Sequence, residues 1–200
     1  MNKFTIVDLL AARIRDNTGS AMKDFDSKRA TPFSYGSGHI RPNRAMDPGL
    51  VYDLTVKDYL NFLCALGYNA TSMGVFYKEP YKCPSKPVKL EDLNYPSIAV
   101  PQLNGTTTVT RTVKNVGLPG TYRVRVVPPI DISVSVKPGV LKFSKVDEEK
   151  KYEVKFKSEK GSVGPGYAFG VIIWSDGKHY VRTPMAVNAV SCEDLGFKGF

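Results

Sequence analysis

The chain has 200 residues, of which 42% are hydrophobic and 11% aromatic. A chain of this length and composition can bury a sizeable core, which excludes an intrinsically disordered protein. Its 28 Lys and Arg residues against 19 Asp and Glu residues give a formal net charge of +9, a balance that fits a polyanion partner such as nucleic acid or an anionic cell-surface polymer. The basic residues are scattered, however, and between positions 145 and 160 they are interleaved with acidic ones. We therefore expect a solvated basic surface and no nucleic-acid site.

The amino terminus has neither the pattern of a secretory signal nor that of a membrane anchor. Asp8 interrupts the apolar run from Phe4 to Ala12, and no convincing small-residue cleavage site follows. No run in the chain approaches the ~20 apolar residues that a membrane-spanning helix needs. We expect no signal peptide and no membrane span in this sequence.

The first third of the chain is rich in turn residues, at 16–20 and 34–38. One helix is predicted over about 56–66, because apolar residues recur there at helical spacing between an N-cap at Thr55, with Asp58 three residues later, and a stop at Gly67. The stretch 77–92 is rich in Lys and Pro, and its prolines predict an extended connector. We place a domain boundary near Leu90.

From Leu93 onward the hydrophobic period changes from 3.6 to 2. The alternation and the turn signals predict seven or eight short strands, at 96–100, 106–116, 122–126, 132–136, 141–143, 152–156, 169–174 and 180–187. This number and spacing indicate an antiparallel β-sandwich of the immunoglobulin or fibronectin type III kind. Arg111 shares the parity of Val109 and Val113, so we expect its side chain at a sheet edge or reaching round to water.

Several motifs resemble one family. They are TPFSYGSGHIRPNRAMDPGLVYD at 31–53, DYLNFLC at 58–64, LNYPS at 93–97 and TRTVKNVG at 110–117, followed by Tyr122 and by VKP at 136–138. Together they resemble the end of plant subtilisin-like serine proteases, from the closing segment of the catalytic domain into the carboxyl-terminal domain. The resemblance extends from about Arg13 to about Val187, whereas Met1 to Ala12 does not resemble the family and suggests an abnormal start.

The resemblance implies a fold and a domain organisation. The family's carboxyl-terminal domain is fibronectin type III-like, in agreement with the predicted sandwich. We expect a mainly β protein: a small helical and turn-rich remnant of the subtilisin α/β catalytic domain plus a linker at 1–90, the sandwich at 91–190 and a tail at 191–200.

The family's catalytic groups are an Asp, a His and a Ser with an Asn at the oxyanion site. All of them precede the stretch that corresponds to Asp16–Gly19, so we expect no catalytic residue here and no peptidase activity of this chain alone. Ser72 lies in a TSMG sequence that superficially echoes the family's nucleophile motif, but it lacks the flanking residues and we expect it to open no helix. His39 and His179 are expected to be structural. The two histidines are far apart and there is no closely spaced Cys or carboxylate set, so no metal or cofactor site is predicted.

A cysteine pair that the resemblance brings out, and two sequons in the sequence itself, concern export. Cys64 and Cys83 match a pair that the family bridges, and the bridge would contribute about 3 kcal/mol; two free thiols are the alternative if the chain stays in the cytosol. Cys192 has no expected partner. The sequons at Asn69 and Asn104 are candidate N-glycosylation sites. The resemblance implies an extracellular, apoplastic location.

Two functions follow as expectations. The chain is either the carboxyl-terminal part of a subtilisin-like serine endopeptidase, whose sandwich supports the folding and activity of a catalytic domain, or a free-standing fibronectin-type module that binds a protein such as an intact subtilase. Protein or peptide substrates are expected only when the chain is joined to a catalytic domain.

Overall fold

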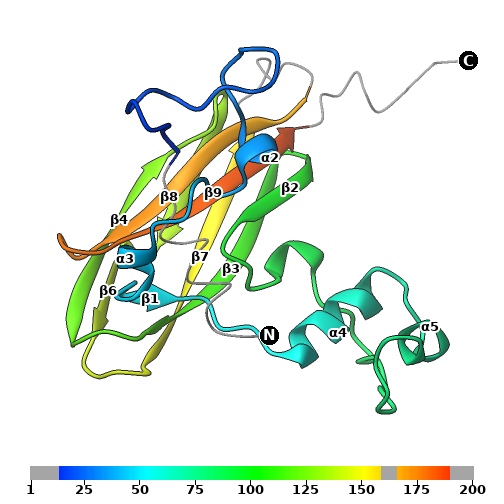
Figure 1. The fold of residues 1–200 in the computed structure, drawn as a ribbon. Coiled ribbons are helices and arrows are strands. Elements are labelled where there is room, and N and C mark those ends of the chain that lie inside the picture. The colour runs from blue at the N-terminus through cyan, green and yellow to red at the C-terminus, as the bar shows by residue number, and fades with distance from the viewer. Residues whose placement is uncertain (1–13, 159–165, 190–200) are drawn as a thin grey trace, which may run out of the picture.

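A computed structural model describes residues 14–158 and 166–189. Two β-sheets pack face to face, and two helices extend to one side of them (Figure 1). The helices are α2 (Pro32–Tyr35), α3 (Pro42–Ala45), α4 (Val56–Ala65), α5 (Ala70–Gly74) and the 3-10 turn η1 (Leu90–Asp92). The strands are β1 (Leu50–Val51), β2 (Ile98–Leu103), β3 (Thr106–Asn115), β4 (Gly120–Val127), β5 (Ile132–Lys137), β6 (Val140–Phe143), β7 (Glu149–Ser158), β8 (Ala168–Ser175) and β9 (Tyr180–Ala189). The first twelve residues and Cys192 lie outside the described part.

The mainly β, fibronectin type III-like sandwich predicted from the hydrophobic period is confirmed. One sheet has the order β1-β3-β7-β5 and the other β2-β9-β8-β4-β6. The prediction of purely antiparallel sheets was wrong at one pair, because β2 runs parallel to β9 with Ile98 opposite Met185. The two strands are far apart in the sequence, so no short hairpin forces them into opposite directions.

Side chains of alternate residues from both sheets fill the space between them. On β7, Tyr152, Val154 and Phe156 are buried while the residues between them face solvent. Trp174 on β8 is fully buried and packs edge-on against Tyr152, with ring centroids 5.2 Å apart. The strict period of 2 on β7 therefore reflects a sheet with one wet face.

A short segment far upstream of the predicted boundary completes this core. Strand β1 pairs antiparallel with the end of β3, with Leu50 opposite Asn115. Leu50, Tyr52 and Leu54 are buried in the same hydrophobic cluster as the sandwich residues. Alternate residues of the stretch 50–54 in the amino-terminal segment, by which we mean residues 14–90, thus lie in the core between the two sheets.

Arg111 lies where β3 is a sheet edge, as expected, because β1 pairs only with Lys114 and Asn115, but its side chain does not reach water. Its side chain is only 3% exposed, and its guanidinium donates hydrogen bonds of 2.7–3.0 Å to the carbonyls of Glu91, Tyr95, Ser97 and Thr110. Burial lowers the pKa of Arg111. The planar fork of donors can satisfy several carbonyls at once, so the arginine is buried without a carboxylate partner.

Side chains of the connector run along the part of β3 that β1 leaves uncovered. Lys89 Nζ donates to the carbonyl of Thr108 at 2.8 Å, and Asp92 Oδ1 accepts the amide of Thr110 at 2.7 Å. Asn94 exchanges two hydrogen bonds with the backbone of Thr112. These three side chains take the place of a neighbouring strand.

The helix predicted from Thr55 onward is confirmed as α4. Thr55 and Asp58 form a capping box, and Leu60 is the buried residue of the helix. Two expectations about this region were wrong. Residues 70–74 form the short helix α5 because the Asn69 side chain caps it by accepting the amide of Ser72. Residues 90–92 form a 3-10 turn at the end of the otherwise extended connector.

Candidate functional site: the junction between the amino-terminal segment and the sandwich

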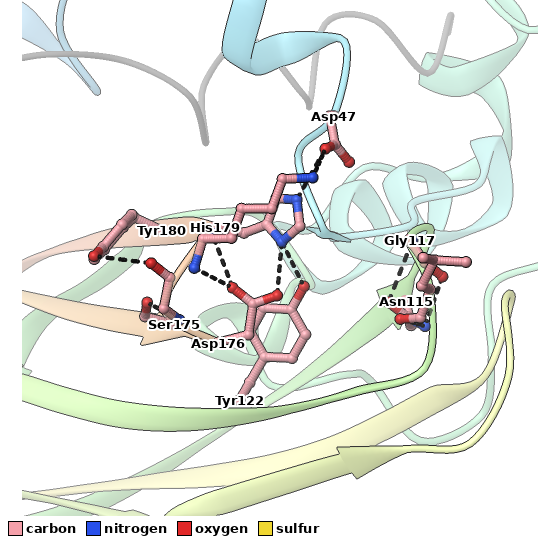
Figure 2. Close-up of polar contacts among 11 residues, drawn as sticks. Asp47, Asn115, Gly117, Tyr122, Ser175, Asp176, His179 and Tyr180 are labelled. Carbon is pink, nitrogen blue, oxygen red and sulfur yellow. Dashed lines mark hydrogen bonds and ion pairs between the residues drawn. The ribbon is translucent and has the colours of Figure 1, made fainter.

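A group of charged and polar side chains gathers where the amino-terminal segment meets the sandwich. Figure 2 shows His179 between Asp176 and Asp47, above the hydroxyl of Tyr122. Asp47 precedes β1, whereas Asp176 and His179 belong to the turn between β8 and β9, and Tyr122 lies on β4. Residues more than 130 positions apart in the sequence are therefore held together at this point.

The imidazole of His179 is paired with a carboxylate on each side. Its Nδ1 lies 2.7 Å from Asp176 Oδ2, and its Nε2 lies 3.1 Å from Asp47 Oδ2. The first contact is an aligned hydrogen bond; the second has the distance of an ion pair but not the alignment of a hydrogen bond. Lys178 Nζ reaches the same Asp47 oxygen at 2.7 Å. Two cationic side chains of the sandwich thus converge on one carboxylate of the segment.

These contacts set the ionisation of the cluster. Burial lowers the pKa of His179, but the hydrogen bond of Asp176 and the negative charges of Asp176 and Asp47 outweigh it, so the pKa lies above its ordinary value. Lys178 and His179 hold the pKa of Asp47 below its usual range. Burial and the neighbouring Asp176 raise the pKa of the Tyr122 hydroxyl. The arrangement favours a protonated histidine between two carboxylates, which is a charge link and not a free general base.

Gly49 allows the chain to pass close to this cluster. Its φ is +76°, and a Cβ at this position would lie within 3.0 Å of the Tyr122 hydroxyl and of the His179 ring. The carbonyl of Gly49 accepts a 2.9 Å hydrogen bond from the amide of Val116, next to the end of β3. Only a residue without a side chain fits the backbone here.

A second set of hydroxyl contacts lies deeper in the core. The hydroxyl of Tyr52 lies 2.5 Å from that of Tyr152 and 2.6 Å from that of Thr183. All three residues are at most 1% exposed. Burial raises the pKa of both tyrosines, so the hydroxyls remain neutral and bond to one another. Tyr52 therefore links the segment to strands of both sheets.

The rest of the amino-terminal segment leaves apolar surface uncovered. Eleven of the eighteen exposed large hydrophobic side chains of the described residues lie between positions 14 and 90. Phe25 is 97% exposed, Val75 87% and Met46 86%. They stand on both sides of the anchored stretch 47–54. Exposed apolar side chains are the raw material of a surface that a partner covers when they form a contiguous patch.

The structure also places the residues that the sequence had singled out. Cys64 and Cys83 form a disulfide with their Cα atoms 5.7 Å apart, which ties α4 to the connector. Asn69 and Asn104 are exposed, at the start of α5 and in the turn between β2 and β3. Glycosylation at either site stays a prediction. His39 is exposed.

The described residues offer no arrangement for peptide hydrolysis. Within them, neither the hydroxyl of Ser72 nor any other serine or cysteine hydrogen-bonds a histidine; the hydroxyl near His179 is that of Tyr122, at 3.4 Å. No group of three or more His, Cys, Asp or Glu side chains in these same residues could hold a metal ion. No helix in this part of the chain is long and apolar enough to cross a membrane.

Most of this junction was not predicted from the sequence. Asp47, Gly49 and Tyr52 lie within the longest family motif but have no local pattern of their own. Two signals in the sequence point to it. They are the alternate large hydrophobic residues Leu50, Tyr52 and Leu54, and the Asp176-Gly177 turn just before His179. Neither signal indicates which strand the segment contacts, because the partners are distant in the sequence.

Comparison with known proteins agrees with the resemblance of the motifs. The family described as "Fibronectin type-III domain" matches residues 92–187. Subtilisin-like protease SBT5.3 of Arabidopsis thaliana is 49% identical over 180 residues, which are 90% of this chain and 23% of that protein. SBT5.4 of the same plant is 47% identical over 92% of this chain, and subtilisin-like protease Glyma18g48580 of Glycine max is 43% identical over 90%.

The chain spans about a quarter of the length of these relatives, 23% in each case. The identity covers both the amino-terminal segment and the sandwich, since 90% of the chain is aligned. The chain is therefore a homologue of the plant subtilisin-like proteases, and it carries a fibronectin type III-like domain.

Proposed function

We propose that this chain is the carboxyl-terminal part of a subtilisin-like serine endopeptidase and that its sandwich supports the folding and activity of a catalytic domain. The observation that carries the proposal is that residues 14–90 are attached to the sandwich at some positions and expose apolar side chains at others. They are anchored in the sandwich through Tyr52 and Asp47, yet they leave apolar side chains such as Phe25 and Val75 almost fully exposed.

The proposed partner of these exposed side chains is the catalytic domain of the protease. A segment that packs on the catalytic domain and also contributes to the sandwich core would hold the catalytic domain and the sandwich in one relative orientation. We propose the division at residue 90 in this sense: residues 1–90 belong to the catalytic side by origin, and residues 91–190 form the sandwich. The substrates of the intact protease would be proteins or peptides.

Proteolysis by this chain alone is not part of the proposal. A serine hydrolase needs a nucleophile, a base and an oxyanion site in one place, and the described residues hold His179 between two carboxylates. Treatment of the purified chain with a fluorophosphonate should label no serine. Stoichiometric labelling would contradict this part of the proposal.

An extracellular location is proposed on two grounds. The Cys64–Cys83 pair is positioned for a disulfide, which persists in oxidising compartments. The sequons at Asn69 and Asn104 are exposed, so that a transferase could reach them. Mass analysis of the chain expressed through a plant secretory pathway should find glycans at these asparagines.

A complementation experiment tests the supporting role. A plant subtilisin-like protease is truncated before the region that matches residue 14 and is refolded with or without this chain. We expect soluble protein and cleavage of a fluorogenic peptide only when the chain is added. Phe25→Asp together with Val75→Asp should abolish the rescue, whereas Ile130→Asp, at a 79% exposed sandwich position, should not.

The alternative function, a free-standing interaction module, predicts a different result. Such a module would bind the intact protease but would not rescue the truncated one. Rescue that is equally strong with the Phe25/Val75 variant would also contradict the proposed docking surface.

A further inference from the structure

The outer face of the sheet β1-β3-β7-β5 combines cations with hydroxyl groups in a regular array. The pairing register places Thr106, Lys157 and Ser133 in one row across three strands, and Thr108, Lys155 and Ser135 in the next. The side chains of all six residues are exposed. We call these two rows the lysine–hydroxyl face. Each row has a lysine at its centre and a hydroxyl on either side.

Lysines outnumber carboxylates on this face, where Glu153 lies opposite Lys137 and between Lys151 and Lys155. Among the described residues, no ion pair involves Lys155 or Lys157, nor Lys151 and Lys137, which extend the face by further rows. Glu153 is the one acidic side chain at the outward positions of β7 between 151 and 157. A local excess of positive charge therefore contributes to the net charge of +9.

The spacing of the face suits an extended ligand. Neighbouring strands lie about 4.8 Å apart, and outward residues of one strand about 6.8 Å apart, so charges and hydroxyls repeat at the scale of one sugar unit. The opposite sheet is partly covered: Phe33 of α2 packs against Tyr167 and Phe169 at the start of β8. Within residues 14–158 and 166–189, no aromatic contact of this kind lies over the lysine–hydroxyl face.

We propose that the lysine–hydroxyl face binds a linear acidic polysaccharide with a carboxylate on each sugar. The lysines would pair with carboxylates, and the Ser and Thr hydroxyls would hydrogen-bond sugar hydroxyls. No aromatic side chain is at the outward positions of these rows, so the face lacks the stacking platforms that single-stranded nucleic acids use. This inference does not depend on the protease role.

The test uses the full chain and polygalacturonate, with fully methyl-esterified polygalacturonate and a single-stranded oligonucleotide of equal charge for comparison. Binding is measured by affinity electrophoresis at several salt concentrations. We expect the wild-type chain to bind polygalacturonate and not its uncharged ester. Lys155→Gln with Lys157→Gln should weaken binding roughly thirtyfold and reduce the salt slope by about two.

The matched control removes the same charge elsewhere. Arg123→Gln with Arg125→Gln changes two exposed cations of β4, in the other sheet, and should leave binding within about twofold of the wild type. Ser133→Ala with Ser135→Ala should weaken binding without changing the salt slope, because these hydroxyls carry no charge. Thermal unfolding of each variant verifies that the fold is kept.

Three outcomes would overturn the proposal. They are no binding of polygalacturonate, an equal loss in the lysine and the arginine variants, and binding of the oligonucleotide that is as tight as that of polygalacturonate. The first two outcomes would mean that this face is not the binding site for the polysaccharide. The third would mean that the face binds polyanions in general.

Discussion

The amino-terminal segment and the sandwich share one hydrophobic core but are stabilised in different ways. The sandwich buries alternate side chains of two sheets over its whole length. Of the segment, only Leu50, Tyr52 and Leu54 are buried members of this core, and polar contacts such as Asp47 to His179 also attach it. The comparison teaches that the sequence boundary between two parts of a protein need not be the boundary of the folding unit. It also separates the apolar side chains that are buried within the chain from the exposed ones that we propose a partner covers.

The comparison is tested most severely by removing the segment. A fragment of residues 92–200 retains the matched fibronectin type III region but loses β1 and the buried Leu50, Tyr52 and Leu54. Deleting buried aromatic and aliphatic side chains costs about 3–5 kcal/mol each, so we expect this fragment to be unfolded by circular dichroism. A fragment of residues 46–200 keeps the anchor and should fold cooperatively. Equal stability of the two fragments would show that the sandwich does not need the segment.

The next largest effect is expected at Arg111, which joins β3 to the start of the sandwich. Arg111→Met removes the donors to the carbonyls of Glu91, Tyr95 and Ser97 and should lower the free energy of unfolding by about 3 kcal/mol. Arg125→Met, at an exposed position, should change it by less than about 0.5 kcal/mol. Denaturant titrations of both variants measure the difference. A loss below about 1 kcal/mol at Arg111 would mean that water replaces its hydrogen bonds.

Gly49 tests the close approach of the segment to the sandwich. Gly49→Ala meets both a positive φ and the side chains of Tyr122 and His179, and we expect a loss of roughly 3 kcal/mol. Gly177 is the matched control, since its φ is +97° but nothing lies near its Cβ position. Gly177→Ala should cost only about 1 kcal/mol. Equal losses in the two thermal melts would assign the whole effect to the backbone and none to the contact.

The smallest effect concerns the charge link at His179. Its pKa is raised in the folded chain by Asp176 and Asp47, against the opposing effect of burial. The stability that it adds is therefore fully present below its unfolded value of about 6.5 and is lost as the pH rises through the folded pKa. The pKa values of Asp47 and Asp176 are lowered, so their share is lost as the pH falls through the folded values.

Unfolding curves between pH 5 and pH 9 measure this contribution. The wild-type chain should lose under about 1 kcal/mol more than His179→Gln as the pH rises. The exposed His39→Gln serves as the control and should follow the wild type. A pH dependence that is identical in the His179 variant would place the titrating group elsewhere.

The strands were predicted well from the sequence because every second residue of a half-buried strand is apolar, as Tyr152, Val154 and Phe156 illustrate. It predicted α4 because the capping box is local. It did not predict β1, whose two residues are too few to form a period, nor the fate of Arg111, which depends on carbonyls 14–20 positions away. The junction at His179 was missed for the same reason. Its members are polar residues whose partners are set by tertiary structure.

The three connector side chains along β3 have a consequence for solubility. An exposed strand edge is a template on which further copies of a chain can add, and long open edges lead to fibrils. Lys89, Asp92 and Asn94 already occupy the backbone groups of Thr108, Thr110 and Thr112. Because the blocking groups are side chains and not a strand, this edge is closed without presenting a new edge beyond it. The connector thus ends the sheet on this side and protects a β-rich chain from adding to its own copies.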